Sequence, residues 1–422
     1  MAAMTHDALT HRTSERPLFR IGRRAPAPQP HPKARRASAP LGRFPRLSHF
    51  AVEYLLALPG GALIGLLWAN LAGESYFWFA HQLSFVVNDL LMVFFFALVT
   101  KEIVEATAPG GVLHPWQRAV LPAAAGAGAT IVPPLLFVAY IRAVDAPMFV
   151  RAWPVTLASD LALGYFVLRT IFGRHPAIPF YLLLAIAANG LGFLALATGT
   201  IGLDLSPGIA IVLLAAALGN VMVLRLARVK SLWPYVVAGG GPSWIALFWG
   251  GFHPALALAP IVFFLPHAPR DPGFFVDAPS GARDTLSNLE RFCRTPAQIA
   301  LFLFGLVNAG VPLRGLEAGM WALPLATLVG KPLGIAAVSL IGLAAGMRLP
   351  HGLGWRDLPV IGVAAGIGFT MALFFATSTL APGQILTETK MGALVSVAGV
   401  GLVYLLARML RVGRFAQSKP SR

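Results

Sequence analysis

Long apolar runs, separated by short polar or glycine- and proline-rich connections, dominate the sequence. Most are long enough for a helix to cross a bilayer, so the pattern predicts an all-α polytopic membrane protein with about twelve transmembrane helices. Gly239 to Pro242 interrupt the region 234–266. Counting that region as one span leaves eleven, with the chain ends on opposite sides of the membrane. The runs cover residues 50–71, 81–107, 118–141, 152–172, 178–199, 207–226, 234–249, 252–266, 297–313, 320–345, 358–380 and 391–413.

The composition agrees with the apolar pattern. Hydrophobic residues make up 57% of the 422 residues, charged residues make up only 12%, and the mean hydropathy is +0.71. Soluble domains carry about 25% charged residues, so a soluble domain is excluded. Cys293 is the only cysteine, which also excludes an internal disulfide or a multi-cysteine metal site. We interpret it as a small residue beside a loop.

Positive charge decides between the two topologies. Residues 1–48 contain ten Lys or Arg against two acids, which supply +8 of the formal net charge of +16. Lys and Arg concentrate on the cytoplasmic side of membrane proteins. With twelve spans, the inward connections carry twelve of these residues and the outward ones carry four. We therefore expect both chain ends to be cytoplasmic.

The same charge pattern predicts three regions along the chain. Residues 1–48 should form a basic, disordered tail that faces anionic lipid rather than nucleic acid, because they are rich in Pro, Ala and Arg and have no apolar period. Residues 49–413 should form the transmembrane domain. Residues 414–422 should form a short basic tail.

Motifs for nucleotide, metal or enzymatic chemistry are missing from the sequence. The stretch LVGKPLGI lacks the Ser or Thr that follows the lysine of a phosphate-binding loop, and Leu325 stands where such a loop needs glycine. The ten histidines show no HExxH or comparable metal-ligand spacing. We therefore predict a protein that is not an enzyme and has no cofactor. Neither rings of charge nor a repeated filter motif suggests a channel, which favours secondary transport.

Asp160 is an acid in the middle of an apolar run. A charged side chain at a helix centre costs about 2.5–3.5 kcal/mol on insertion scales. In WPVTLASDLALGYFVL, Asp160 follows Pro154, Thr156 and Ser159, and Gly164 lies one turn later. This combination predicts a helix interrupted near mid-membrane, with peptide dipoles that face a bound ion. The alternative is a structural carboxylate satisfied by a neighbouring helix.

Lys331 places a cation in another apolar run. It is followed by Pro332 and lies too centrally in residues 320–345 to reach either interface. A buried lysine either pairs with an acid or gives up its proton. Both outcomes suit a proton-coupled transporter, and the alternative is an ion pair with a structural role only.

A second interrupted helix is predicted in VAAGIGFTMALFF. Gly366, Gly368 and Thr370 fall inside the apolar run 358–380. This run and the run of Asp160 lie on either side of the midpoint of the chain. Paired interruptions in the two halves of a chain indicate the midplane site of a transporter.

Several stretches together resemble a known family. LASDLALG, LVNAGVPLRG, VGKPLGI and GIGFTM, in this order and spacing, resemble the bacterial NhaA-type sodium/proton antiporters, and the resemblance runs from about residue 50 to residue 412. VNDLLMVFFFALVTKE extends the match and places Asp89 and Glu102 on positions that the family keeps acidic. The resemblance implies inverted repeats with two discontinuous helices, a multi-pass protein of the bacterial inner membrane, and a homodimer. It also implies exchange of cytoplasmic sodium or lithium for external protons, with a role in pH homeostasis.

The resemblance assigns candidate residues as well. Ser159 and Asp160 fit the Thr-Asp pair of the family's broken fourth helix, and Lys331 fits the lysine of its tenth helix. Glu102 and Glu290 fit acids that are associated with pH response at the cytoplasmic funnel. The resemblance therefore implies a transient sodium site at Asp160.

The fifth helix departs from the family pattern. Where the family reads AIIDDLG, this chain reads IAANGLG, so Asn189 and Gly190 occupy the two aspartate positions. In the family, the second aspartate binds the cation and carries protons, and the first pairs with the lysine. Asn189 can still offer a carbonyl oxygen to sodium but cannot titrate, and Gly190 supplies neither charge nor oxygen. Asp160 is then the one acid deep in the predicted site.

Two hypotheses follow from this departure. In the first, Asp160, the Ser159 hydroxyl, the Asn189 carbonyl and water bind a cation, while Lys331 and Asp160 exchange protons with it. Exchange is then expected to be one for one. In the second, Asp160 pairs with Lys331, no cation turns over, and the protein has taken another substrate or a regulatory role. We favour the first hypothesis.

Overall fold

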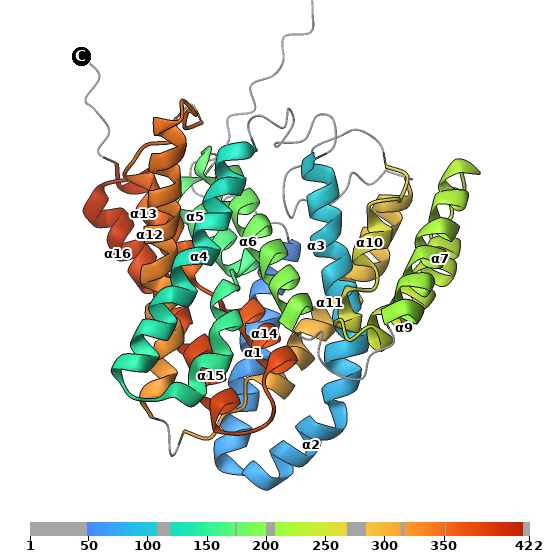
Figure 1. Ribbon diagram of the computed structural model, residues 1–422, viewed down its shortest axis with the longest axis horizontal. Helices are drawn as coiled ribbons and strands as arrows, with labels where there is room; N and C mark the ends of the chain where they lie inside the picture. The colour runs from blue at the N-terminus through green and yellow to red at the C-terminus, as the bar shows by residue number, and fades with distance from the viewer. Residues whose placement is uncertain are drawn as a thin grey trace, which may run out of the picture. The chain divides into compact units, whose positions relative to one another are not determined.

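The described part of the chain is built from helices. The structure is a computed structural model and describes residues 49–107, 119–173, 175–199, 207–267, 284–313, 317–350 and 352–416. All regular elements in these residues are helical (Figure 1). The expected tail over residues 1–48, and most of the one over 414–422, lie outside them. The α-helices are α1 (His49–Leu71), α2 (Gly73–Phe85), α3 (Met92–Thr107), α4 (Val120–Ala143), α5 (Leu161–Phe172), α6 (Ala177–Gly199), α7 (Pro207–Leu226), α8 (Trp233–Tyr235), α9 (Gly241–Trp249), α10 (Ala259–Val262), α11 (Thr285–Asn308), α12 (Ala322–Ala344), α13 (Asp357–Gly366), α14 (Phe369–Thr379), α15 (Gln384–Val395) and α16 (Gly399–Leu410).

Shorter elements of other helix types connect or interrupt these α-helices. Two are π-helical, with one extra residue in each hydrogen-bonded turn, and the others are 3₁₀-helices. The π-helices are η1 (Val86–Leu91) and η4 (Val236–Gly240), and the 3₁₀-helices are η3 (Pro147–Leu157), η5 (Pro254–Leu256), η6 (Ala318–Trp321), η7 (Ser396–Ala398) and η8 (Gly413–Phe415).

Every predicted apolar run coincides with helical elements, but the predicted number of twelve spans is not confirmed. In the described residues, six helical segments are long and apolar enough to cross a membrane, or eight if each of two bent pairs is one span. The described apolar part of α1, Ala57–Leu71, is shorter. The region 234–266, where the sequence left the count open, is divided among α8, η4, α9, η5 and α10.

The two bent pairs lie in the runs where small and polar residues interrupt the apolar pattern. The pair η3 and α5 is bent by 58°, and the pair α13 and α14 by 40°. Pro154 lies inside η3 and has no N–H to donate to a preceding turn. Gly366 ends α13, and Gly368 stands directly before α14.

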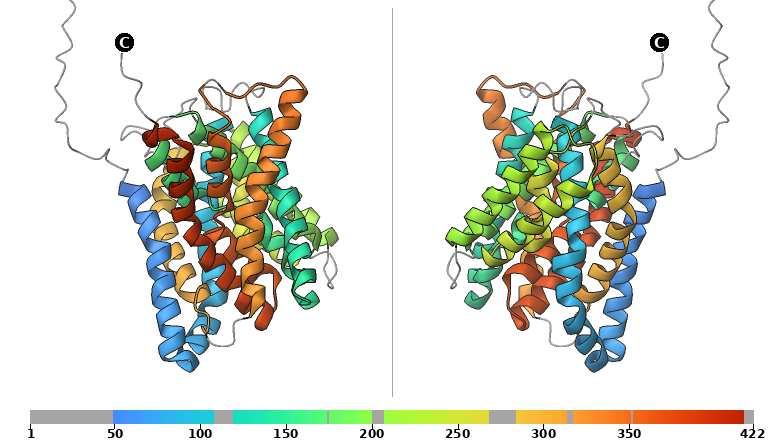
Figure 2. Two further views of the ribbon diagram at one scale, coloured as in Figure 1. Left: turned by 90° about the vertical axis from the view of Figure 1, so that its left-hand side faces the viewer. Right: turned by 90° about the vertical axis from the view of Figure 1, so that its right-hand side faces the viewer.

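Close contacts between long helices hold these pairs in place. α12 packs along α4 and α13, and α1 packs along α11, which lies beside it in Figure 2. α4 and α12 meet at Gly128 and Gly334, where a Cβ on either glycine would overlap the main-chain carbonyl of the other. Glycine is therefore required for this approach, which fixes the helix that carries Lys331.

An aromatic cluster joins α3, α6 and α14. Its members are Phe96, Phe193, Phe374 and Phe375, and the ring centroids of Phe96 and Phe374 lie 4.8 Å apart. Those of Phe193 and Phe375 lie 5.1 Å apart. Edge-to-face contacts of this kind add to the stabilisation from burial. They hold α6, with Asn189, against the second bent pair.

Candidate functional site

The two bent helix pairs touch at their breaks. Residues 158–160 lie between η3 and α5, and Ile367 and Gly368 lie between α13 and α14. The main-chain N–H of Asp160 donates to the main-chain oxygen of Ile367, with 2.9 Å between nitrogen and oxygen. The N–H of Gly368 donates to the Ser396 hydroxyl at 3.3 Å. Each break thus satisfies main-chain groups that a continuous helix would have paired internally.

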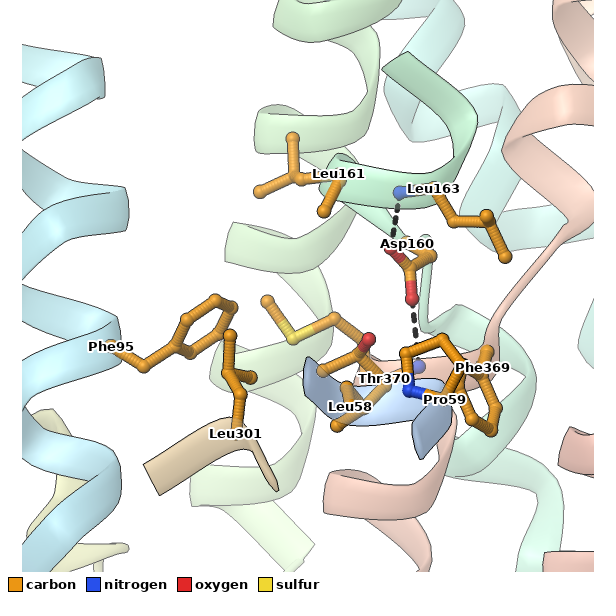
Figure 3. Close-up of a pocket in the computed structure, with 11 residues that line it drawn as sticks. Leu58, Pro59, Phe95, Asp160, Leu161, Leu163, Leu301, Phe369 and Thr370 are labelled. Atoms are coloured by element: carbon orange, nitrogen blue, oxygen red, sulfur yellow. Dashed lines mark hydrogen bonds between the residues drawn. The ribbon is translucent and has the colours of Figure 1, made fainter. Parts of the chain in front are cut away.

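The Asp160 carboxylate joins the N-terminal ends of two helices (Figure 3). Its Oδ1 accepts the main-chain N–H of Leu163 in α5 at 2.9 Å. Its Oδ2 accepts the N–H of Thr370 in α14 at 2.7 Å. Unpaired N–H groups and the helix dipole favour negative charge at such ends. Asp160 is 1% exposed, so two helix ends replace water around a buried carboxylate.

A small cavity lies beside this carboxylate. It has a volume of about 30 Å³, and its lining includes Asp160 and Thr370 (Figure 3). Leu58 from α1, Phe95 from α3 and Leu301 from α11 supply apolar lining. This space beside the Asp160 carboxylate has room for water or a small cation.

Lys331 contacts the break between η3 and α5 through its side-chain ammonium. Its side chain is fully buried on α12. Its ammonium donates to the Ser159 hydroxyl at 2.7 Å, to the carbonyl of Leu157 at 3.4 Å, and to the carbonyl of Ala158. These carbonyls end η3, and the C-terminal end of a helix favours positive charge. In the described residues, Lys331 and Asp160 form no ion pair, although both contact the same break.

Asn189 fastens the break to α6 through both atoms of its amide. Its Oδ1 accepts the main-chain N–H of Ser159 at 2.9 Å, and its Nδ2 donates to the main-chain oxygen of Ser159 at 2.8 Å. Asn189 is 3% exposed. The carbonyl oxygen that the sequence offered to a cation therefore already accepts one hydrogen bond, and a second lone pair remains.

Gly190, at the other aspartate position of the family, has open space around it. A Cβ added at this residue would have no heavy atom within 4 Å. Gly190 is exposed, although Asn189 beside it is buried. The position has room for a larger side chain, so packing does not require the loss of the aspartate.

Gly366 has the opposite surroundings. A Cβ at this position would lie 2.7 Å from the main-chain oxygen of Thr327 and 2.9 Å from Cα of Leu328. Both atoms belong to α12, which also carries Lys331. Gly366 thus allows α13 to approach the helix of Lys331.

The two candidate pH-response acids meet at a lysine. Lys101 is fully buried, and its ammonium lies 3.2 Å from Glu102 Oε1, 2.7 Å from Glu105 Oε2 and 3.1 Å from Glu290 Oε2. The sequence predicted Glu102 and Glu290 but missed Lys101 and Glu105. A Lys and a Glu four residues apart in one helical run would have indicated the pair 101–105. The contact with Glu290 on α11 depends on tertiary structure.

Sodium/proton antiporters from several bacteria resemble most of this chain. The Na(+)/H(+) antiporter NhaA of Geobacter sulfurreducens is 38% identical over 373 residues, which cover 86% of this chain and 97% of that protein. The same-named proteins of Desulfitobacterium hafniense (strain DSM 10664 / DCB-2) and a Jannaschia species are 37% and 34% identical. Their alignments cover 86% and 87% of this chain, and 96% and 98% of the relatives.

A solved structure shares the fold. It is the structure of the sodium proton antiporter MjNhaP1 from Methanocaldococcus jannaschii at pH 8, with a TM-score of 0.58 and 14% sequence identity. The likeness covers 87% of this chain and 98% of that one. The model of the family described as Na+/H+ antiporter 1 matches residues 61–406. This chain is therefore a multi-pass membrane protein that belongs to the Na+/H+ antiporter 1 family.

Proposed function

We propose that this protein exchanges cytoplasmic sodium or lithium for external protons through a site with a single carboxylate, Asp160. The observation that carries the proposal is the position of this carboxylate, between two helix N-terminal ends and beside a cavity of about 30 Å³. The N–H groups of Leu163 and Thr370 hold the carboxylate at this cavity, where helix breaks of a transporter form its ion site. The proposed setting is the bacterial inner membrane, with both chain ends cytoplasmic and two copies in a dimer.

Oxygen atoms are available for a cation at the break. A carboxylate has about four lone-pair positions, and the two N–H groups from Leu163 and Thr370 occupy two of them. Water in the cavity supplies further proposed ligands. The Ser159 hydroxyl, which accepts from Lys331, and the second lone pair of Asn189 Oδ1 complete the proposed set from outside the cavity lining. Hard cations prefer such oxygen ligands. Each half of the chain contributes one bent pair to the site, which supports the proposed arrangement of inverted repeats.

Lys331 couples proton movement to cation binding in this proposal. When Lys331 is charged, its charge and that of Asp160 nearly cancel, and a cation is held weakly. When the lysine releases its proton, the Asp160 carboxylate attracts the cation more strongly. One proton is then released for each cation bound, so the proposed exchange is one for one.

The alternative is a protein of the same fold that does not exchange sodium, and the contacts of Asn189 favour it. The amide binds the main chain of Ser159 twice and resembles a structural clamp. Gly190 adds no charge. Such a protein would carry another substrate or act as a regulatory membrane protein.

Proton movement in proteoliposomes, driven by sodium or lithium between pH 6 and 9, tests the two proposals. The comparison includes the native protein, Asp160→Asn, and the double variant Asn189→Asp with Gly190→Asp. Glu74→Gln, which changes an exposed acid on α2, is the matched control. Exchange that is present in the native protein and in Glu74→Gln, and is lost in Asp160→Asn, supports the single-carboxylate site. Exchange that appears only in the double variant would favour the alternative.

A further inference from the structure

An acid outside the deep site faces two larger cavities. Asp89 lies in the π-helical turn η1, between α2 and α3. Cavities of about 630 and 350 Å³ share Asn88, Asp89 and Thr377 in their linings. Neither shares a lining residue with the cavity at Asp160. Single π-helical turns inside longer helices occur often at functional sites, and an acid within an apolar run is a functional candidate.

Hydrogen bonds hold the main chain of this turn, but in the described residues none of them involves the Asp89 carboxylate. The indole N–H of Trp244 donates to the main-chain oxygen of Asp89 at 3.0 Å. Asn308 donates to Oδ1 of the neighbouring Asn88 at 2.8 Å. In the part of the chain that the structure describes, no hydrogen bond reaches the Asp89 carboxylate, whose side chain is 22% exposed.

His253 is near Asp89 but does not neutralise it. Its Nδ1 lies 3.8 Å from Asp89 Oδ1, which is too long for a hydrogen bond. The same nitrogen accepts the main-chain N–H of Ala255 at 3.3 Å. A ring nitrogen that accepts a hydrogen bond carries no proton to donate, so the carboxylate has no donor on this side.

The smaller cavity is also lined by three hydroxyl groups that present lone pairs. Thr377, Ser378 and Thr379 donate their protons to main-chain oxygens of α14 at 2.9, 2.6 and 2.6 Å. Their oxygens can therefore act only as acceptors toward the cavity. These residues form the last turn of α14, where the helix dipole is negative. A carboxylate, hydroxyl oxygens and a negative helix end are suited to a hard cation.

A lysine lies in the larger cavity instead. Lys390 lines the cavity of about 630 Å³ but not the smaller one, whose lining includes His253. The smaller cavity, at about 350 Å³, has room for an ion with part of its hydration shell. We propose that it is an outer binding site for a hydrated monovalent cation, with Asp89 as the anionic ligand and the hydroxyls of Thr377 and Ser378 as supporting ligands.

The proposed outer site and the deep site lie at opposite ends of one helix. Thr370 lines the deep cavity from the first turn of α14, and Thr377 lines the outer one. Seven residues of α-helix span about 10 Å. The choice of a monovalent cation rests on the proposed function, but binding at Asp89 can be measured without transport.

Equilibrium binding of radiolabelled sodium to the purified full-length protein tests this site, with lithium as competitor and choline chloride to keep ionic strength constant. The variants are Asp89→Asn, Ser378→Ala and Asp160→Asn, with Glu74→Gln as the matched control. We expect saturable binding in Asp160→Asn and Glu74→Gln. In Asp89→Asn we expect affinity to fall at least about tenfold, the effect of a contact worth about 1.4 kcal/mol.

Ser378→Ala keeps the site testable if Asp89→Asn does not fold. It removes one oxygen ligand and leaves the carboxylate, so affinity should fall severalfold while size-exclusion behaviour is unchanged. The proposal is overturned if Asp160→Asn shows no saturable binding. It is also overturned if binding is unchanged in both Asp89→Asn and Ser378→Ala. Binding that depends on Asp89 in a protein that exchanges no ions supports the outer site and contradicts the proposed antiport. If exchange depends on Asp160 but not on Asp89, and Asp89→Asn binds sodium as the native protein does, the proposed antiport is supported and the outer site is contradicted.

Discussion

Asp160 and Lys331 contact the same helix break but are neutralised by different main-chain groups. Asp160 accepts the N–H groups that begin α5 and α14, and Lys331 donates to the carbonyls that end η3. In the described residues they do not pair with each other. Helix ends therefore stabilise both buried charges. If one of the two residues is neutralised, the other keeps its main-chain hydrogen bonds.

A double-mutant cycle on Asp160 and Lys331 distinguishes this arrangement from a buried ion pair. Breaking a buried pair from one side typically costs about 3–5 kcal/mol, and removing the second charge then recovers stability. Here Lys331→Met leaves the carbonyls of Leu157 and Ala158 without a donor, and Asp160→Asn cannot repair that loss. We expect the double variant to be no more stable than either single variant. Thermal unfolding of the purified protein checks this, and a double variant with recovered stability would contradict it.

Asn189 should contribute to stability even if it binds no ion. Asn189→Ala leaves the buried N–H and carbonyl of Ser159 without partners, at a cost of about 1–3 kcal/mol for each group. Asn189→Asp keeps an acceptor for the N–H but places a carboxylate oxygen against the carbonyl. We therefore expect both variants to unfold at lower temperature than the native protein in detergent, with alanine the worse at acidic pH, where the aspartate can be protonated and donate.

The Asn189→Ala variant has a matched control. Asn220 on α7 donates to the main-chain oxygen of Ala238 at an exposed position, and Asn220→Ala should change the unfolding temperature little. If Asn220→Ala and Asn189→Ala have equal effects, the amide at 189 is not a clamp on the break.

The fold and site could be predicted from the sequence to the extent that local patterns determine them. The apolar runs indicated where helices form, and Asp160 and Lys331 were identified because charged residues in such runs are costly. Thr370 was identified, with Gly366 and Gly368, as an interruption of an apolar run. The number of spans was not confirmed. The hydropathy of an apolar run does not show that the run is divided into short segments such as α8 and α10.

Tertiary contacts determine what the sequence could not indicate. The second of the two hypotheses paired Asp160 with Lys331, whereas the carboxylate accepts main-chain N–H groups from two helices far apart in sequence. Asn189 was identified by its oxygen, although its amide nitrogen is equally engaged. The environment of Gly190 also depends on neighbours that no local pattern specifies.

Alanine at Gly190 and alanine at Gly366 should have opposite effects on stability. At Gly190 a Cβ meets no atom within 4 Å, so replacing glycine inside α6 should raise stability by up to about 1 kcal/mol. At Gly366 the added Cβ would lie 2.7 Å from the main-chain oxygen of Thr327, and such overpacking costs about 1–3 kcal/mol. Thermal unfolding of the two variants beside the native protein tests the difference. Equal shifts of the unfolding temperature in the same direction would contradict the close approach of α13 to α12 at Gly366.

The last prediction concerns Lys101, whose ammonium lies within 3.2 Å of three glutamates. Lys101→Met keeps the length of the side chain and removes the charge, so that Glu102, Glu105 and Glu290 repel one another. Removing one side of a buried charge cluster costs about 3–5 kcal/mol. The repulsion acts between ionised carboxylates, so removing one of them should recover part of the loss.

Thermal unfolding of native protein and Lys101→Met measures this loss. Adding Glu105→Gln to Lys101→Met removes one repelling charge and should restore part of the stability. Lys101→Arg keeps the charge and controls for packing around α3. If adding Glu105→Gln to Lys101→Met restores no stability, lost packing rather than charge explains the effect, and the cluster holds α3 against α11 by packing.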